Sequence, residues 1–306
     1  MATDYPLVTL AFPLYRSARF LSVIRDNIAA FTYPNLEIII SDRHGFDDAL
    51  AQLQAQYAND SRFRFIRATD QIDWVSHYNE LLRLATGTYF CWMPHDDSYP
   101  AEYISQLVDY LENNPDRIVA FGQLNGISYD GAQPVPAFCN QPVPTLTGHY
   151  YPLREALWMV MFWTIGIPFR GLFRREPLLR ANLWIHPTKD NVAPDVYWMF
   201  GVALLGRFGP VPECSCLKRF YRESTHVQWK DGARQRLEAF RVLYGYLKRS
   251  GLNPIKVIGG TVVLASWTLL RLIAYLGGTS PVFKTVKSTL KRVIFGRMLK
   301  ASNYQR

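Results

Sequence analysis

Two adjacent carboxylates follow an apolar run in the stretch FCWMPHDDSYP, residues 90 to 100. Asp96 and Asp97 repel each other, and a bare pair at the end of a buried strand carries a large desolvation cost. A hard divalent cation that is also held by phosphate oxygens would neutralise the pair and stabilise charge on a leaving diphosphate. Alternatively, Asp96, Asp97 and Ser98 cap a helix that begins near Pro100. The spacing alone leaves both interpretations open.

The first 125 residues alternate between two periodicities. Short apolar runs predict strands at 7–12, 36–41, 62–67, 88–93 and 117–122, and helical spacing predicts helices at 17–30, 46–58, 74–85 and 101–113. The run RFRFIR alternates polar and apolar residues, as an edge strand does. Strands that alternate with helices predict a mostly parallel sheet with helices on its flanks.

In a parallel sheet, ligands bind beyond the carboxyl ends of the strands. Pro13 and Tyr15 follow the first predicted strand, Asp42 the second, and the pair Asp96 and Asp97 the fourth. We therefore expect these residues to gather on one rim. Residues 126–150, rich in proline, glycine and polar groups, predict a long loop, and the aromatic and arginine residues of 151–210 predict a second half that completes the core.

Composition and charge narrow the class of protein. Hydrophobic residues make up 49% of the 306 residues and charged residues 19%, which excludes a disordered chain. The last 68 residues hold twelve Lys and Arg and no acid, whereas the first 238 carry a net charge of −3. This asymmetry predicts an anionic partner for the C-terminal part, either a phospholipid surface or nucleic acid.

The four cysteines and the N-terminal sequence predict a cytosolic setting. None of the cysteines forms a CxxC pair, so reduced structural thiols are favoured over a zinc site. The segment MATDYPLVTLAFPLY has neither a basic start nor a long apolar run, and nothing in it suggests export.

The motifs TLAFPLYRS, YPNLEIIISD and WVSHYNELLRLATGTYFCWMPHDDSYP, in this order, resemble the nucleotide-binding half of glycosyltransferase family 2, in its branch with an HDD motif. The resemblance covers roughly residues 5–225. It implies a GT-A fold, a Rossmann-like, mostly parallel sheet with flanking helices. We therefore predict a catalytic domain over 1–225, with a nucleotide-binding half at 1–125 and an acceptor half at 126–225, and a helical extension over 226–306.

The resemblance assigns donor-site roles residue by residue. Pro13 and Tyr15 match positions that line the nucleotide pocket, and Asp42 matches the contact to the nucleobase. Asp96 matches the contact to the donor ribose, and Asp97 matches the ligand of Mg²⁺ or Mn²⁺. Two departures stand out, because Pro94 replaces the first acidic residue of the usual Asp-x-Asp-Asp motif and Tyr78 replaces a frequent arginine. Within the N-x5-A-x-G pattern of the family, Asn79 is a further predicted donor-binding residue.

The family places its catalytic base after a G-x-F-R-R element, here GLFRRE at 171–176. Asp195, which opens a predicted helix after Pro194, is the predicted base, and Asp190 is the reserve candidate. The alternative for Asp195 is a first-turn charge favoured by the helix dipole.

Two further sets of residues match the acceptor half. The resemblance puts Gly171 and Arg174 on the acceptor side. It also puts the basic segment LKRFYRESTH near the leaving diphosphate, with Arg222 as the predicted donor-binding residue and with Arg219 and His226 as alternatives.

The C-terminal extension carries membrane signals. Residues 232–249 predict an amphipathic helix, and the fourteen uncharged residues between Lys256 and Arg271 would span ~21 Å as a helix, short of the ~30 Å hydrocarbon core. An interfacial or re-entrant segment is therefore favoured over a full span. Basic and apolar residues alternate further on, in VFKTVKSTLKRVIFGRMLK, and predict a helix suited to anionic lipid.

These observations predict an inverting, metal-dependent glycosyltransferase that is peripheral or monotopic at the cytoplasmic face of the cell membrane. Its donor would be a nucleotide-diphosphate sugar, with UDP favoured. Its acceptor would be a glycan or a lipid-linked group, in cell-surface polysaccharide synthesis. The alternative is a non-catalytic protein of the same fold that binds nucleotide sugar or glycan. Nucleic-acid binding is not expected, because no nucleic-acid motif accompanies the basic tail.

Overall fold

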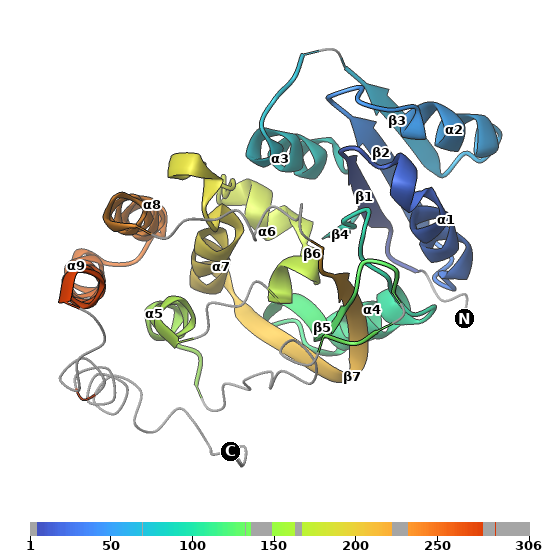
Figure 1. Cartoon of the computed structure of the whole chain (residues 1–306). Helices are drawn as coiled ribbons and strands as arrows, with labels where there is room; N and C mark the ends of the chain where they lie inside the picture. Colours follow the sequence, from blue (N-terminus) through green and yellow to red (C-terminus); the bar gives the residue numbers. More distant parts are fainter. Residues whose placement is uncertain are drawn as a thin grey trace. The chain divides into compact units, whose positions relative to one another are not determined.

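The computed structural model describes residues 5–68, 70–131, 133–135, 149–162, 167–221, 232–277 and 285. They form two compact units that interleave along the chain. The first unit contains the sheet with its helices, and the described residues of the second unit are mainly helical (Figure 1). The second unit includes residues 144–166 and 186–207 as well as the C-terminal helices. We predicted instead a single boundary near residue 225. The domain division at that boundary stays a prediction.

The described part of the first unit is built on one mixed sheet in the order β3-β2-β1-β4-β6-β5-β7. Its strands are β1 (Val8–Leu14), β2 (Leu36–Asp42), β3 (Phe63–Arg67), β4 (Tyr89–Trp92), β5 (Arg117–Ile127), β6 (Leu172–Arg174) and β7 (Arg207–Arg219). β1, β2 and β4 are buried along their whole length, which explains their continuous apolar sequence. β3 lies at the edge, as its alternating pattern predicts.

The first four strands are parallel, with Leu14 opposite Asp42 and Ala11 opposite Trp92. This register confirms the predicted strands and brings the carboxyl ends of β1, β2 and β4 to one edge. The sheet is not parallel throughout, because the short strand β6 lies between β4 and β5 and is antiparallel to both. The sequence pattern did not predict β6, since three residues are too few to show a period.

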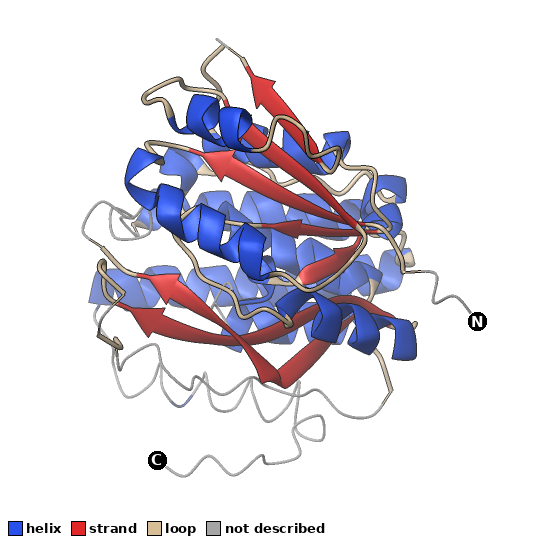
Figure 2. Ribbon diagram, turned by 90° about the vertical axis from the view of Figure 1, so that its right-hand side faces the viewer, coloured by secondary structure: helices blue, strands red, loops and turns tan. Residues whose placement is uncertain are grey.

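Helices cover both faces of this sheet. They are α1 (Leu21–Ala30), α2 (Ala49–Gln56), α3 (Trp74–Leu84), α4 (Tyr103–Asn113) and α6 (Arg175–Arg180), with the 3-10 turns η1 (Ala18–Phe20) and η3 (Ile167–Arg170). α1, α2 and α4 lie on one side of the strands and α3 on the other (Figure 1). Figure 2 looks onto the side of α1, α2 and α4. The four predicted helices therefore correspond to α1–α4, each within a few residues.

The second unit consists of α5 (Pro152–Phe162), η4 (Lys189–Asn191), α7 (Pro194–Leu205), α8 (Ala233–Arg249) and α9 (Pro254–Gly277). α8 matches the predicted amphipathic helix, and Val242, Leu243, Tyr246 and Leu247 form its buried face. α9 is a single helix, and its segment 254–275, with a mean hydropathy of 1.8, is long and apolar enough to cross a membrane. The basic helix predicted further on lies outside the described residues, except for Thr285.

A buried histidine makes the stability of the first unit depend on pH. His77 of α3 is 3% exposed, and its Nε2 lies 2.8 Å from Oγ of Ser41 on β2. Burial lowers the pKa of His77 from its usual 6.5 to about 4, although the nearby Glu80 carboxylate acts in the opposite direction. The folded state therefore resists protonation that the unfolded state accepts between these two pH values.

We predict that the free energy of unfolding decreases as the pH falls from about 6.5 to about 4, with His77 accounting for at most about 3 kcal/mol. His77→Gln, which keeps a polar group near Ser41, should make this decrease smaller in urea titrations across the same pH range. His149→Gln is the matched control, because His149 is exposed. An unchanged pH dependence in His77→Gln would contradict the prediction.

Candidate active site

The HDD motif forms a turn after β4 instead of capping a helix. The amide N of Asp97 donates to the carbonyl O of Pro94 at 3.2 Å, and Ser98 exchanges two backbone hydrogen bonds with Leu217 of β7 at 2.8 and 2.9 Å. α4 begins only at Tyr103, with Glu102 at its N-cap position and no side-chain cap. The helix-capping alternative for Asp96 and Asp97 is therefore excluded.

A largely buried arginine neutralises the second aspartate. Nε of Arg170, at the end of η3, donates to Oδ2 of Asp97 at 2.5 Å, and the backbone N of Arg219 donates to Oδ1 at 3.3 Å. Asp97 has no exposed surface. Burial disfavours the charged form of Arg170, but the charge of Asp97 outweighs this effect, and the pKa of Arg170 is raised.

The pair between Arg170 and Asp97 explains how the two aspartates can lie side by side. Both oxygens of Asp97 already accept hydrogen bonds, and a guanidinium occupies the position that a cation would take. The metal-ligand role predicted for Asp97 does not fit these surroundings. Within the described residues, no group of three or more His, Cys, Asp or Glu side chains is placed to hold a metal ion.

Asp96 differs from Asp97 because it remains partly exposed. Burial opposes its ionisation, but the charges of His95 and Lys218 and a hydrogen bond from Tyr221 hold its pKa below the usual value. Its backbone O accepts from Nε of Arg219 at 3.1 Å. Asp96 is therefore an ionised carboxylate with solvent access, and its chemistry suits a ribose hydroxyl or a divalent cation that takes its other ligands from phosphate.

The loop after β1 supports the HDD turn. Nδ1 of His95 lies 2.7 Å from Oγ of Ser17, and this oxygen also accepts from the backbone N of Tyr15 at 2.9 Å. The ring of His95 stacks on Phe20 at 5.1 Å between centroids. Burial lowers the pKa of His95, although the charges of Asp96 and Asp97 act in the opposite direction. His95 thus links the two loops.

Arg19 lies on an aromatic surface beside the HDD turn. Its guanidinium carbon is 4.9 Å from the ring centres of both Phe20 and Tyr221 and 5.7 Å from that of Tyr129. Phe20 connects this cluster to His95, and Tyr221 connects it to Asp96. The sequence reading missed Arg19, although an arginine after the first strand of a nucleotide-binding sheet is a reasonable candidate for a phosphate ligand.

A second aromatic cluster lies beyond β1 and β2. Tyr15 is 50% exposed and Phe46 is 46% exposed, and their ring centroids are 5.3 Å apart. His44 stacks on Phe46 at 5.3 Å, and Arg16 lies over the same ring at 5.0 Å. This surface suits the flat face of a nucleobase. Only Tyr15 was predicted from the sequence.

Asp42 shapes the loop that carries this cluster. Its Oδ1 accepts from the backbone N of His44 and of Gly45, both at 2.9 Å, and Gly45 has a φ of 62°. Such a turn favours glycine because a side chain is strained at positive φ. Pro13 lies inside β1, opposite Ser41 of β2. Both predicted residues thus lie at the expected rim, and their contacts to a donor stay predictions.

Two other predicted residues have structural roles. Both ends of the Asn79 carboxamide bond the backbone of Ile185 at 2.8 Å, so Asn79 tethers this segment. A Cβ on Gly171 would lie 2.4 Å from the carbonyl O of Ala120 in β5, which explains why glycine is needed there. The donor-side role of Asn79 and the acceptor-side role of Gly171 stay predictions.

Arg174 lies at the end of β4 opposite to the HDD turn, and its acceptor-side role stays a prediction. Because β6 is antiparallel to β4, Arg174 pairs with Tyr89 at the amino end of β4, and its guanidinium bonds Arg117, Leu111 and Tyr89. Arg170, which was not predicted, is the arginine of this segment that reaches the HDD turn. Arg219 binds the same turn through the carbonyl O of Asp96, and it also donates to the carbonyl O of Tyr129 at 2.8 Å.

The predicted donor ligand Arg222 and its alternative His226 lie outside the described residues. No role is therefore assigned to either of them from the geometry of the site.

Asp195 lies in the first turn of α7, in the second unit, and is partly buried. The backbone before it is strained, because Asp190, Asn191 and Ala193 have positive φ values of 58°, 49° and 52°. Such conformations cost of order 1–3 kcal/mol each and gather at functional sites. The reserve candidate Asp190 accepts from Nε2 of Gln235 on α8 at 3.2 Å.

Comparisons with known proteins agree with this arrangement. A chondroitin synthase from Escherichia coli is 30% identical over 104 residues, covering 34% of this chain and 15% of the synthase. An uncharacterized glycosyltransferase from Haemophilus influenzae is 31% identical over 117 residues, covering 38% of this chain and 36% of the relative. The uncharacterized glycosyltransferase EpsJ from Bacillus subtilis is 27% identical over 179 residues, covering 58% and 51%. The matches thus cover about half or less of the length of these relatives.

Solved structures share the fold at low sequence identity. S. aureus TarS in complex with UDP-GlcNAc has a TM-score of 0.65 at 14% identity, covering 88% of this chain and 73% of that one. The mannosyltransferase PcManGT from Pyrobaculum calidifontis in complex with GDP-Man and Mn²⁺ has a TM-score of 0.52 at 18% identity, covering 94% and 81%. These likenesses show the GT-A fold.

The family model named glycosyl transferase family 2 matches residues 10–176, more than half of the chain. The match runs from β1 through the HDD turn to the Arg170 segment. With this match and the GT-A arrangement of the sheet, the chain belongs to glycosyl transferase family 2.

Proposed function

We propose that this protein transfers a sugar from a nucleotide-diphosphate donor to a hydroxyl group of an acceptor, with inversion at the anomeric carbon. One observation supports the proposal above all others. The carboxyl ends of β1, β2 and β4 carry an exposed aromatic surface, an ionised aspartate and an arginine within one unit of a family 2 fold.

The donor would lie along this rim. Its base would rest on Tyr15 and Phe46, while Asp96 would contact the ribose. Arg19 would then face the diphosphate, because it packs on the ring of Tyr221, which hydrogen-bonds to Asp96. A UDP-sugar is the favoured donor, in line with the ligand of the structurally similar TarS.

Mg²⁺ or Mn²⁺ is the proposed cofactor, and Asp96 is the residue that would hold it. When bound, such an ion neutralises charge on the diphosphate as it leaves. Asp97 would contribute indirectly, because its pair with Arg170 fixes the turn on which Asp96 stands.

Asp195 is the proposed base. Its carboxylate would take the proton of the acceptor hydroxyl while the hydroxyl oxygen forms a bond to the anomeric carbon and the bond to the diphosphate breaks. The strained backbone at Asp190, Asn191 and Ala193 supports a functional role for this segment.

The acceptor is proposed to be a glycan or a lipid-linked group in cell-surface polysaccharide synthesis, at the cytoplasmic face of the membrane. The similarity to a chondroitin synthase and the apolar helix α9 support this setting.

Asp96→Asn should remove the stabilisation that Mn²⁺ adds to a complex with UDP, while the unliganded protein keeps its melting temperature. The reason is that a ligand stabilises only the state that binds it, and Asp96 is partly exposed. Thermal shift with UDP, GDP and dTDP, each with and without Mn²⁺, measures this effect. If Asp96→Asn responds to Mn²⁺ as the parent does, Asp96 does not hold the ion.

Asp97→Asn is the matched contrast. It leaves the largely buried guanidinium of Arg170 without its counter-charge and should lower the free energy of unfolding by about 3 kcal/mol. The double variant Asp97→Leu with Arg170→Met should recover part of this loss in urea titrations, since neither partner then carries a charge. A stable Asp97→Asn that has lost Mn²⁺ binding would return the metal-ligand role to Asp97.

Asp195→Asn should lower turnover by ~100-fold or more and leave the affinity for donor nucleotide little changed, because a base acts on the acceptor. Single-turnover transfer assays and nucleotide titrations separate these two quantities. Asp190→Asn serves as the control with a neighbouring carboxylate. If Asp195→Asn works at a near-normal rate and Asp190→Asn does not, the base is Asp190.

A further inference from the structure

α9 is long and apolar enough to cross a membrane, but its contacts within the second unit hold it along another helix. A Cβ on Gly260 would lie 2.9 Å from both Leu247 of α8 and Leu153 of α5, so the three helices meet closely there. Leu264 and Trp267, one and two turns further on, are 1% and 7% exposed. One side of α9 is therefore packed against protein.

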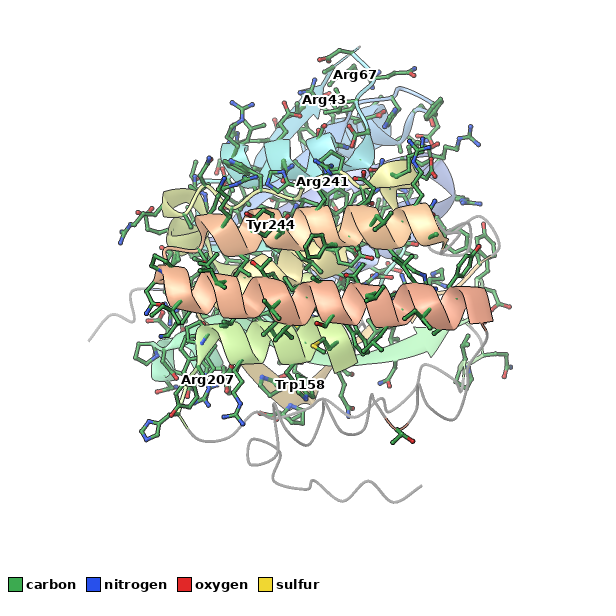
Figure 3. The ribbon with its side chains drawn as sticks, turned by 90° about the vertical axis from the view of Figure 1, so that its left-hand side faces the viewer. Arg43, Arg67, Trp158, Arg207, Arg241 and Tyr244 are labelled. Carbon is green, nitrogen blue, oxygen red and sulfur yellow. The ribbon has the colours of Figure 1, made fainter. Side chains whose placement is uncertain are left out.

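The far end of α9 is held to the opposite end of α8. Nη1 of Arg236 donates to the carbonyl O of Arg271 at 2.8 Å, and the same guanidinium lies 5.1 Å from the ring centre of Tyr275. Gly260 meets Leu247 near the end of α8, whereas Arg271 meets Arg236 near its start. The two helices therefore run antiparallel. Figure 3 shows them side by side.

The outward side of α9 is apolar. Ile255, Ile258, Val262, Leu269 and Ile273 are between 56% and 81% exposed. Their spacing of three, four or seven residues places them on one face, over about 27 Å of helix. A row of exposed aliphatic side chains of this length marks a surface that is covered in the working protein.

The adjacent helix α8 is charged where it meets solvent. Its exposed residues include Leu237 and Tyr244 together with the basic residues Arg234, Arg241, Lys248 and Arg249. Arg241 and Tyr244 are labelled in Figure 3, on the helix next to α9. Basic side chains beside an apolar row match the phosphates and acyl chains at the surface of an anionic membrane.

We propose that α8 and α9 lie flat in the membrane surface, with the row from Ile255 to Ile273, here called the α9 apolar row, in the acyl region. α9 cannot cross the bilayer alone, because α8 would have to enter with it. α8 carries five Lys and Arg, and charged side chains are costly at the membrane centre. A second copy docked face to face would set basic rows against each other, so a lipid surface fits better than a homodimer.

This inference rests on the membrane attachment in the proposed function and adds its orientation. It is tested with the full chain on vesicles of phosphatidylglycerol and phosphatidylcholine. Spin labels at Ile255→Cys, Val262→Cys, Leu269→Cys and Ile273→Cys should report equal depths below the phosphates. The described cysteines Cys91, Cys214 and Cys216 are buried, and the parent chain serves as the labelling blank.

Two other depth patterns would overturn the inference. If the labels at 255 and 273 lie near opposite surfaces and those at 262 and 269 lie near the centre, α9 crosses the membrane. If all four labels stay in water or in protein contact, another part of the chain, a second copy or a protein partner covers the α9 apolar row.

A binding assay separates this inference from the glycosyltransferase proposal. Ile258→Glu with Leu269→Glu should weaken vesicle binding at least tenfold and leave the thermal shift with UDP unchanged. The control Gln54→Glu with Gln56→Glu adds the same charge at exposed positions of α2 and should keep vesicle binding. If the α9 variant binds vesicles as the parent does, the inference is wrong. If the parent binds vesicles but does not bind UDP, only the glycosyltransferase proposal is contradicted.

Discussion

The ion pair between Asp97 and Arg170 holds together the part of the sheet on which the site is built. A carboxylate without exposed surface needs a counter-charge, and here it comes from a residue 73 positions later in the chain. The backbone of Arg219 adds a third segment, and its side chain binds the carbonyl groups of Asp96 and Tyr129. β4, the η3–β6 segment and β7 therefore meet at the HDD turn. The position of Asp96 depends on the contacts of its buried neighbour Asp97.

The rim divides into an apolar and a charged portion, both connected through the loop after β1. Ser17 joins Tyr15 to His95 by hydrogen bonds, and Asp47 of the loop before α2 accepts from the backbone N of Ala18 at 2.9 Å. The aromatic surface after β2 and the HDD turn after β4 are thus fixed relative to each other through side chains of one short segment. Such cross-linking prepares a binding surface before the ligand arrives and lowers the ordering entropy lost on binding.

The sequence predicts the elements in which a hydrophobic pattern repeats, but it does not predict the direction of a short strand. The continuous apolar runs of β1, β2 and β4 and the helical spacing of α3 identified the parallel half of the sheet, and with it the rim of Tyr15, Asp42 and Asp96. The three-residue strand β6 carries no period, so its antiparallel direction could not be predicted. That direction decides which arginine of FRGLFRR reaches the HDD turn, and the sequence pattern could not identify Arg170 for this reason. Arg19 could not be predicted from the sequence, because one of the rings against which it packs, Tyr221, lies about 200 positions later in the chain.

Both outer strands of the sheet resist the addition of a further strand. β3, at one edge, exposes Arg64 and Arg67, and Arg64 is held by Glu37 and by the carbonyl O of Leu84. β7, at the other edge, carries Pro210 and Pro212, which lack the amide hydrogen that a neighbouring strand would need. Charged side chains and prolines on edge strands prevent sheets of separate molecules from joining into aggregates. The sheet therefore offers no template for edge-to-edge growth, so the apolar surface of the C-terminal helices is the part of the described structure that remains open to association.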